Sequence, residues 1–209
     1  MKESSFMEPF TIIAFGDSLT YGYGVLDHIP FPACLKKDFP KWRVLNKGVN
    51  GDTTKDALER IERDVLMFHP QIVTIFFGSN DCSLVEGYYL PLTEYEKNLR
   101  SITELVLSLQ HDKKFNNGKT LPIFITPPPV VDTDFFPFTT TDRVMLYAEA
   151  VKKIALEYDC PLVDFFSAVW AKKQEAYEDF FQFDGIHLSN AGYALLYPMI
   201  RDAIASFTK

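Results

Sequence analysis

Short apolar runs alternate with longer amphipathic stretches along the chain. The runs are rich in β-branched and aromatic residues and too short for helices, which predicts buried strands. The predicted strands cover residues 12–15, 43–45, 72–77, 121–126 and 161–165. The stretches between them place apolar residues three and four positions apart, which predicts helices that pack one face on a sheet.

The predicted helices follow the strands in order. They run through residues 31–39, 57–66, 93–109, 141–158, 167–177 and 190–207. Thr93 and Glu96 form a capping-box pattern at the start of the third of these helices. Ser189 has the position of an N-cap for the last one. Each of the first four helices therefore returns the chain to the end of the sheet where the next strand starts.

This alternation determines the predicted fold class. Strands joined by crossover helices form a parallel sheet with right-handed connections and helices on both faces. We therefore predict an α/β fold, a three-layer α/β/α sandwich with a five-stranded parallel sheet. The 209 residues contain no internal repeat or low-complexity segment and suffice for one buried core, so we expect a single domain over residues 1–209.

Charge narrows the classes of partner. The chain has 21 Lys and Arg against 28 Asp and Glu, which gives a net charge of −7 and a pI near 5.1. Its basic residues form no cluster, which argues against a surface for nucleic acid or an anionic membrane. We expect a small neutral substrate instead.

The first residues of the chain and its cysteines indicate the cellular compartment of the protein. Glu3 and Glu8 precede an apolar run that is only as long as a strand, so we predict neither a signal peptide nor a membrane span. Cys34, Cys82 and Cys160 are far apart and odd in number, which is typical of reduced thiols. We expect a cytoplasmic protein, and the sequence leaves its oligomeric state open.

Ser18 directly follows the first predicted strand, in the turn Gly16-Asp17-Ser18. Open α/β sheets place their chemistry at this edge. A serine hydroxyl is a weak nucleophile, so a catalytic role requires a base, an acid that orients the base, and an oxyanion site. The alternative is that the turn only caps the following helix.

Asp184 and His187 lie in the last loop before the final helix. His187 is the candidate general base for Ser18, and Asp184 is the candidate acceptor for the Nδ1–H of that histidine. A turn with a structural histidine is the alternative. The position behind Gly185 and before a capped helix favours the catalytic interpretation.

Gly51 and Asn80 follow the second and third strands. The backbone N–H groups of Ser18 and Gly51 and the side-chain amide of Asn80 are candidates to converge on a developing oxyanion. Taken alone, Asn80 is explained more simply as a turn residue at the end of a strand.

Two aromatic loops leave the same edge of the predicted sheet. Rings there would form the wall of a small apolar pocket that favours short acyl chains. The alternative for the second loop is packing against the core. The candidate pocket residues are Tyr21 and Tyr23 in the first loop, and Phe135, Phe136 and Phe138 in the second.

Four sequence blocks resemble, in order, those of the SGNH (GDSL-type) hydrolase family. They are Gly16-Asp17-Ser18-Leu19, Asn46-x-Gly48-x-x-Gly51-x-Thr53, Gly78-x-Asn80-Asp81 and Asp184-x-x-His187. The resemblance implies a flavodoxin-like fold with Ser18 as nucleophile, His187 as base and Asp184 as its orienting acid. It also implies that Gly51 and Asn80 are oxyanion donors.

A narrower resemblance concerns the substrate. The segments 76–81, 91–95 and 126–129 are similar to the isoamyl acetate-hydrolysing esterase branch and related small bacterial esterases. The expectation is a serine esterase for short-acyl esters that acts through an acyl-enzyme and needs no cofactor or metal. Within the family, the alternatives are a carbohydrate O-acetyl esterase and a lysophospholipase.

Two alternatives belong to other classes. Asp17, Asp81, Asp184 and His187 are residue types that hold metals in phosphoesterases, which need no serine nucleophile. The second alternative is a binding module that has the same fold but does not catalyse a reaction. The complete set of candidate catalytic residues argues against this alternative.

Overall fold

A computed structural model describes residues 10–111, 115–132, 137–175 and 177–207. Its centre is a five-stranded sheet with the strand order β2-β1-β3-β4-β5, in which every neighbouring pair is parallel. The strands are β1 (Thr11–Gly16), β2 (Arg43–Gly48), β3 (Ile72–Phe76), β4 (Leu121–Ile125) and β5 (Leu162–Val163). The predicted α/β fold class is confirmed.

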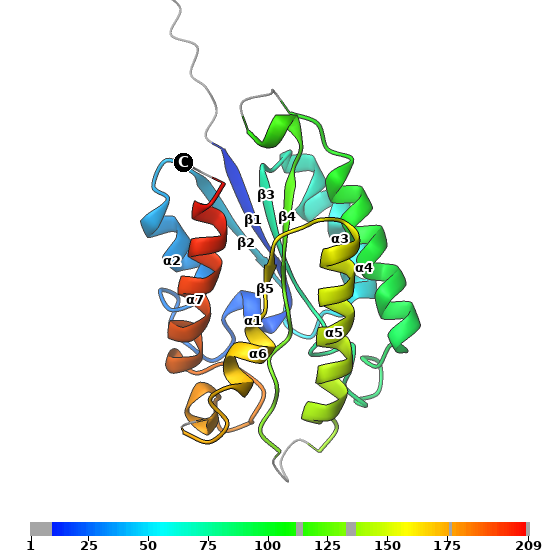
Figure 1. Cartoon of the computed structure of the whole chain (residues 1–209), viewed down its shortest axis with the longest axis vertical. Coiled ribbons are helices and arrows are strands. Elements are labelled where there is room, and N and C mark those ends of the chain that lie inside the picture. The colour runs from blue at the N-terminus through cyan, green and yellow to red at the C-terminus, as the bar shows by residue number, and fades with distance from the viewer. Residues whose placement is uncertain (1–9, 112–114, 133–136, 176, 208–209) are drawn as a thin grey trace, which may run out of the picture.

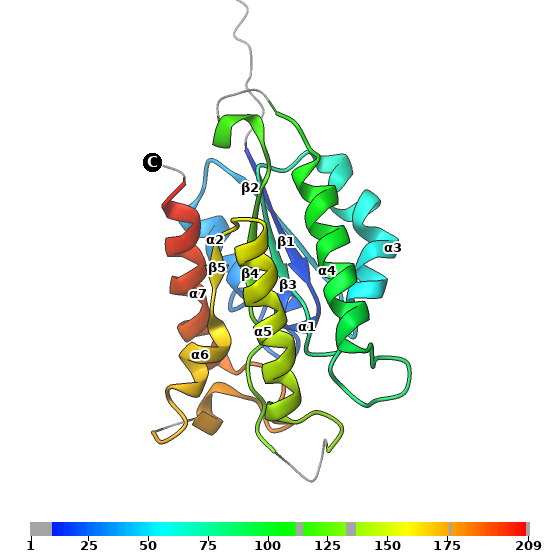
Figure 2. The ribbon, with the colours of Figure 1, turned by 45° about the vertical axis from the view of Figure 1, so that its right-hand side comes forward.

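Helices cover both faces of the sheet (Figure 1). On one face lie α2 (Phe31–Asp38) and α7 (Asn190–Ala205); on the other lie α3 (Thr54–Asp64), α4 (Leu92–Leu107) and α5 (Thr141–Glu157). Figure 2 shows α4 and α5 side by side over the sheet. The short elements are α1 (Ser18–Tyr21), α6 (Phe165–Trp170) and the 3₁₀ turns η1 (Leu66–Phe68), η2 (Asn116–Gly118) and η3 (Tyr177–Phe180).

The central strands are buried on both faces. Along β1, Ile12 and Ala14 belong to the core beneath α2 and α7, while Ile13 and Phe15 belong to the core beneath α3, α4 and α5. All four side chains are inaccessible to solvent. Two buried faces explain why the strand sequences are continuously apolar rather than alternating.

Helix starts agree with the sequence signals in part. The Ser189 hydroxyl caps α7 by accepting hydrogen bonds from two backbone N–H groups. The capping box predicted at Thr93 is wrong. The N-cap residue of α4 is Pro91, which makes no side-chain capping hydrogen bond, and the helix begins at Leu92, so Thr93 already lies in its first turn. The structure has a capping box at Thr53, whose partner is Asp56 at the start of α3.

The last strand is shorter than predicted. β5 ends at Val163, and Phe165 is already the first residue of α6. Asp164 caps that helix, because its Oδ1 accepts the backbone N–H of Ser167 at 3.1 Å. The apolar run therefore contains a strand and the start of a helix, and hydrophobicity alone does not separate them.

The order of strands fixes where a ligand can bind. β1 pairs with β2 on one side and with β3 on the other, so the connections diverge there and leave a crevice at the carboxyl edge. Ser18 follows β1 and Asn80 follows β3, which places both beside this crevice.

In the described part of the chain, no helix is long and apolar enough to cross a bilayer. Cys82 is buried, Cys34 and Cys160 are partly exposed, and all three are free thiols.

Candidate active site

Ser18 is the first residue of α1, just beyond the end of β1. Asp17 caps this helix, because its Oδ1 accepts the backbone N–H of Leu19 at 2.9 Å. The turn is thus a cap, as the alternative interpretation proposed, but the capping side chain is the aspartate. The Ser18 hydroxyl is turned to His187, with 3.0 Å between Oγ and Nε2.

His187 is held by Asp184. The His187 Nδ1 lies 2.6 Å from Asp184 Oδ2, while Asp184 Oδ1 accepts the backbone N–H groups of Ile186 and His187 at 3.0 Å each. Partial burial acts to raise the pKa of Asp184, but the hydrogen bonds from His187 and the backbone outweigh it and hold that pKa below the usual value. An ionised carboxylate only accepts hydrogen bonds, so this contact requires a proton on His187 Nδ1, and in the neutral ring that tautomer presents the Nε2 lone pair to Ser18.

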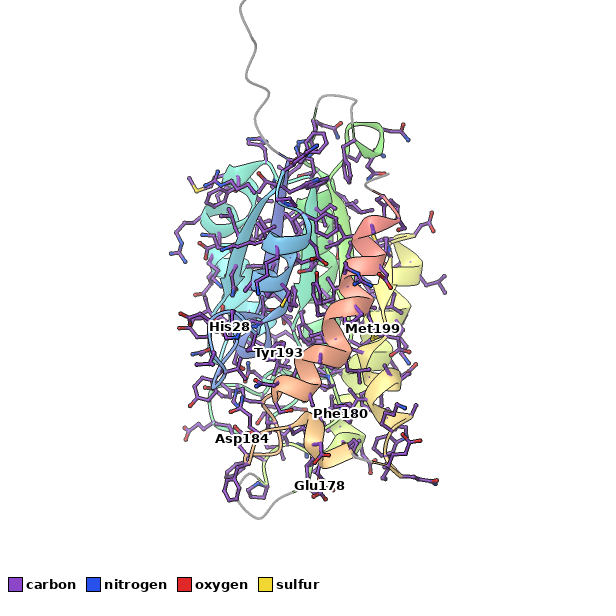
Figure 3. The ribbon with its side chains drawn as sticks, turned by 90° about the vertical axis from the view of Figure 1, so that its left-hand side faces the viewer. His28, Glu178, Phe180, Asp184, Tyr193 and Met199 are labelled. Atoms are coloured by element: carbon purple, nitrogen blue, oxygen red, sulfur yellow. The ribbon has the colours of Figure 1, made fainter. Side chains whose placement is uncertain are left out.

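The loop that carries Asp184 precedes α7, at the end of the molecule where the strands finish (Figure 3). Tyr193 of α7 donates its hydroxyl hydrogen to the carbonyl oxygen of Leu19 at 2.8 Å. Leu19 follows Ser18 directly. One buried hydrogen bond therefore links the helix behind His187 to the turn that carries the serine.

Tyr23 covers one side of His187. The ring centroids are 4.4 Å apart and the planes are inclined by 38°. The backbone of Tyr23 is fixed from the other loop, because Gln182 Nε2 donates to its carbonyl oxygen at 2.7 Å. The imidazole thus has an aromatic ring against its face and a carboxylate at one edge.

Gly51 and Asn80 lie on neighbouring loops that are joined by a hydrogen bond. Asn80 Nδ2 donates one hydrogen to the carbonyl oxygen of Asp52 at 2.9 Å, which leaves its second N–H available. Gly51 has a φ of +80°, which favours glycine, and a Cβ there would lie 2.7 Å from the hydroxyl oxygen of Tyr88, so the Tyr88 side chain would have to shift. Within the described residues, the backbone N–H groups of Ser18 and Gly51 have no protein acceptor.

These residues surround one cavity of about 220 Å³. Ser18, His187, Gly51 and Asn80 line it, as the sequence predicted that they would meet at this edge. Asp184 stands behind His187 and does not line it. The remaining lining residues are Tyr23, Asn50, Ser79, Ser83, Tyr88, Thr139 and Ile186.

The predicted aromatic wall differs from the structure. Tyr23 lines the cavity, but Tyr21 and Phe138 do not, and Phe135 and Phe136 lie outside the described residues. Tyr21 ends α1 against the tip of β2, where its carbonyl oxygen accepts the Asn46 side-chain N–H at 3.1 Å.

The backbone of Phe138 accepts two hydrogen bonds. Its carbonyl oxygen accepts the N–H of Leu84 and an N–H of Arg143, both at 2.8 Å. The next residue, Thr139, lines the cavity in its place. Sequence reasoning missed Tyr88, although an aromatic pair with Tyr89 in a long connection at the carboxyl edge is the same signal that singled out the other loops.

Two further carboxyl groups are buried behind the site. Burial, with the negative charges of Asp81 and Asp52, raises the pKa of Asp17 to about 8 although Leu19 N–H acts to lower it. Burial also raises the pKa of Asp81 to about 6, against the hydrogen bonds from Thr54. Asp17 therefore differs from Asp184, because its surroundings favour the neutral form of the carboxyl group.

The metal-site alternative needs four side chains to converge. Asp17 and Asp81 are buried, whereas Asp184 is paired with His187 at the rim of the cavity. Among the described residues, no group of three or more His, Cys, Asp or Glu side chains is arranged to hold a metal ion.

Comparison with known families agrees with this geometry. The model of the GDSL-like lipase/acylhydrolase family matches residues 14–195, which includes every block named above. The chain belongs to this family. As a GDSL-family member it is a carboxylic ester hydrolase, and the resemblance inferred from the sequence is confirmed.

Several GDSL-family relatives are esterases by name. The isoamyl acetate-hydrolyzing esterase 1 homolog of Rattus norvegicus is 29% identical over an alignment that covers 95% of this chain and 84% of that protein. The acetylxylan esterase of Geobacillus stearothermophilus is 33% identical over 162 residues, which cover 74% of this chain and 68% of that one. Among solved structures, a lipase/acylhydrolase from Enterococcus faecalis is 28% identical with a TM-score of 0.78, covering 94% and 96% of the two chains.

Proposed function

We propose that the chain is a serine esterase that hydrolyses short-acyl carboxylic esters through an acyl-enzyme intermediate. The observation that carries this proposal is the continuous row of contacts from Asp184 through His187 to Ser18, at 2.6 Å and 3.0 Å. The row ends in a cavity large enough for a small acyl group. A nucleophile, a base and an orienting acid in this order are what serine-based acyl transfer requires.

In the first step, Ser18 Oγ attacks the ester carbonyl carbon while its proton moves to His187 Nε2. The imidazolium that forms is stabilised by Asp184, which accepts the Nδ1–H and keeps the ring in place. The low pKa of Asp184 supports this role, because a neutral carboxyl group would not stabilise the cation.

The carbonyl oxygen becomes an oxyanion in the tetrahedral intermediate. The backbone N–H groups of Ser18 and Gly51 and the second N–H of Asn80 Nδ2 are its donors. Support comes from their shared cavity and from the lack of protein acceptors for the two backbone groups among the described residues. Donors that are oriented before reaction stabilise developing charge most effectively.

The intermediate collapses when His187 passes its proton to the leaving alkoxide, which departs as an alcohol and leaves the acyl group on Ser18. A water molecule then attacks the acyl carbon. His187 takes the proton of that water and returns it to Ser18 Oγ, which releases the carboxylic acid.

The size of the cavity and the names of the relatives point to short acyl groups. A volume of about 220 Å³ is smaller than the roughly 300–1,000 Å³ of ordinary ligand pockets. Isoamyl acetate and acetylated xylan, named in two relatives, are both acetyl esters. We propose that acetyl and similarly short groups occupy the cavity.

A carbohydrate O-acetyl esterase is the second candidate. It shares the acyl chemistry and differs in the leaving group. The acetylxylan esterase relative favours it. So do the hydroxyl and amide groups of Asn50, Ser83 and Thr139 around the cavity, because these groups can bind sugar hydroxyls.

Labelling combined with turnover tests the proposal. A fluorophosphonate should label wild-type protein at Ser18 and abolish hydrolysis of p-nitrophenyl esters, while the Ser18→Ala variant should be neither labelled nor active. A panel from acetyl to palmitoyl esters with an acetylated sugar separates the two candidates. Loss of activity in EDTA with recovery on adding a divalent ion would instead support the phosphoesterase alternative.

A further inference from the structure

Arg60 is a buried charged residue that the proposed mechanism does not use. It lies in α3 with 6% of its surface exposed, and its guanidinium group stacks 4.5 Å above the ring of Phe15. Arginine is seldom buried unless its donors are paired. They are paired here: Nε donates to Asp52 Oδ2 at 2.5 Å, Nη2 to the Gly16 carbonyl oxygen at 3.0 Å, and Nη1 to the Lys47 carbonyl oxygen at 3.0 Å and to Asp64 Oδ2 at 3.3 Å.

Three of these acceptors belong to the segments that carry the candidate oxyanion donors. Gly16 ends β1 two residues before Ser18. Lys47 stands near the end of β2, four residues before Gly51. Asp52 follows Gly51 directly.

Asp52 also connects Arg60 to the third donor. Its side chain accepts from Arg60, while its carbonyl oxygen accepts from Asn80 Nδ2 at 2.9 Å. The guanidinium group is therefore joined, through one residue, to the loop after β3 as well.

Among the described residues, one backbone hydrogen bond joins the end of β1 to the turn after β2. The carbonyl oxygen of Gly16 accepts the N–H of Val49 at 3.1 Å, and the same oxygen accepts from Arg60. A planar guanidinium group with donors pointing in several directions can hold acceptors from separate segments, whereas a lysine ammonium group acts as a point charge.

We propose that Arg60 is a positioning residue that sets the distance between Ser18 and the oxyanion donors Gly51 and Asn80. It does not line the cavity, so it acts on the donors rather than on substrate. This inference rests on the proposed function. Because the donors matter most in the transition state, misplacing them lowers kcat and leaves KM nearly unchanged.

The test compares Arg60→Lys with Arg63→Lys in the full chain. Arg63 is a matched control, because it lies in the same helix and also bonds Asp64, but its side chain is 72% exposed. With p-nitrophenyl acetate, Arg60→Lys should lower kcat on the order of 10²-fold at similar KM, which is the typical effect of a 1 Å misplacement. Arg63→Lys should match the wild type. An Arg60→Lys variant with wild-type kcat would overturn the proposal.

A double-mutant cycle separates positioning from stability. If Arg60 acts through the oxyanion donors, Asn80→Ala should lower kcat much less in the Arg60→Lys background than in the wild type. If the reductions in kcat of Arg60→Lys and Asn80→Ala simply multiply in the double variant, Arg60 would contribute to stability alone and the proposal would be overturned. If Arg60→Lys does not fold, Asp52→Asn serves as the second background, because it keeps the shape of the side chain but weakens the ion pair with Arg60. Asn80→Ala should show the same coupling in this background.

Failure of this inference is distinguishable from failure of the proposed function. A wild-type chain that neither hydrolyses esters nor takes up the fluorophosphonate at Ser18 would defeat the proposed function. An active, labelled wild type beside unaffected Arg60 and Asp52 variants would defeat only the role of Arg60.

Discussion

Tyr23 lies against the imidazole of His187, with 4.4 Å between the ring centroids. The ring belongs to the loop after α1, while the histidine belongs to the loop before α7. The contact therefore joins the segment that carries Ser18 to the segment that carries its base, and it closes one side of the cavity.

Removal of that ring should slow turnover. We predict that Tyr23→Ala lowers kcat several-fold, because an aromatic face stabilises a neighbouring cation by about 0.5–1 kcal/mol at an exposed site. Tyr23→Phe should keep most of the activity. Tyr21→Ala is the matched control, since Tyr21 does not line the cavity. Equal kcat values for the Tyr23→Ala variant and the wild type would show that the stacking has no part in turnover.

Tyr88 should limit acyl length. Its hydroxyl oxygen lies close to Gly51 and the residue lines the cavity, so Tyr88→Ala should move the optimum of a p-nitrophenyl ester series to longer chains. Each added methylene that fits contributes about 0.8 kcal/mol of burial. Tyr89→Ala, at an exposed neighbour outside the cavity, should leave the profile unchanged. An unchanged profile in the Tyr88 variant would place the limit elsewhere.

Asn80→Ala should reduce kcat by about 10²–10³ with little change in KM, the usual effect of losing one oxyanion donor. Steady-state kinetics on a short ester measure both constants. A higher KM at unchanged kcat would make Asn80 a substrate-binding residue.

Asp17 should make stability depend on pH. Burial raises the pKa of its carboxyl group from 3.8 to about 8, so the folded chain holds this proton more tightly than the unfolded chain does. The stability it contributes is therefore fully present below the ordinary pKa and is lost as the pH rises towards 8. Asp17→Asn keeps an oxygen for the Leu19 N–H but does not titrate.

Urea unfolding at pH 5 and pH 8 measures this effect. The free energy of unfolding of Asp17→Asn, relative to the wild type, should increase between the two pH values. Asp27→Asn, at an exposed position, is the control and should follow the wild type. A constant difference for Asp17→Asn would mean that Asp17 is already ionised in the folded chain.

The sequence was sufficient for the number and order of the strands, the strand-end turns and the meeting of Ser18, His187 and Asp184, because buried runs and turn residues are local signals; it was not sufficient for the end of β5. It was not sufficient for the cavity wall. Tyr21 and Tyr23 are two residues apart, and which one faces the cavity depends on where α1 ends, at Gly22 with a φ of +97°.

Arg60 shows a second limit. The amphipathic pattern of α3 predicts its arginines on the exposed face, yet Arg60 is buried. Apart from Asp64 in the same helix, its acceptors come from the ends of two strands and from the loop after β2. The sequence of the helix alone therefore does not predict that Arg60 is buried.

The central claim is that Ser18 and His187 act in one chemical step. The most direct measurement is kcat on p-nitrophenyl acetate for Ser18→Ala, His187→Ala and the double variant. We predict that each single change lowers kcat on the order of 10⁴-fold and that combining them adds little, because either change alone disables the same step. Losses that multiply in the double variant would show that the two residues do not share a step and would contradict the account.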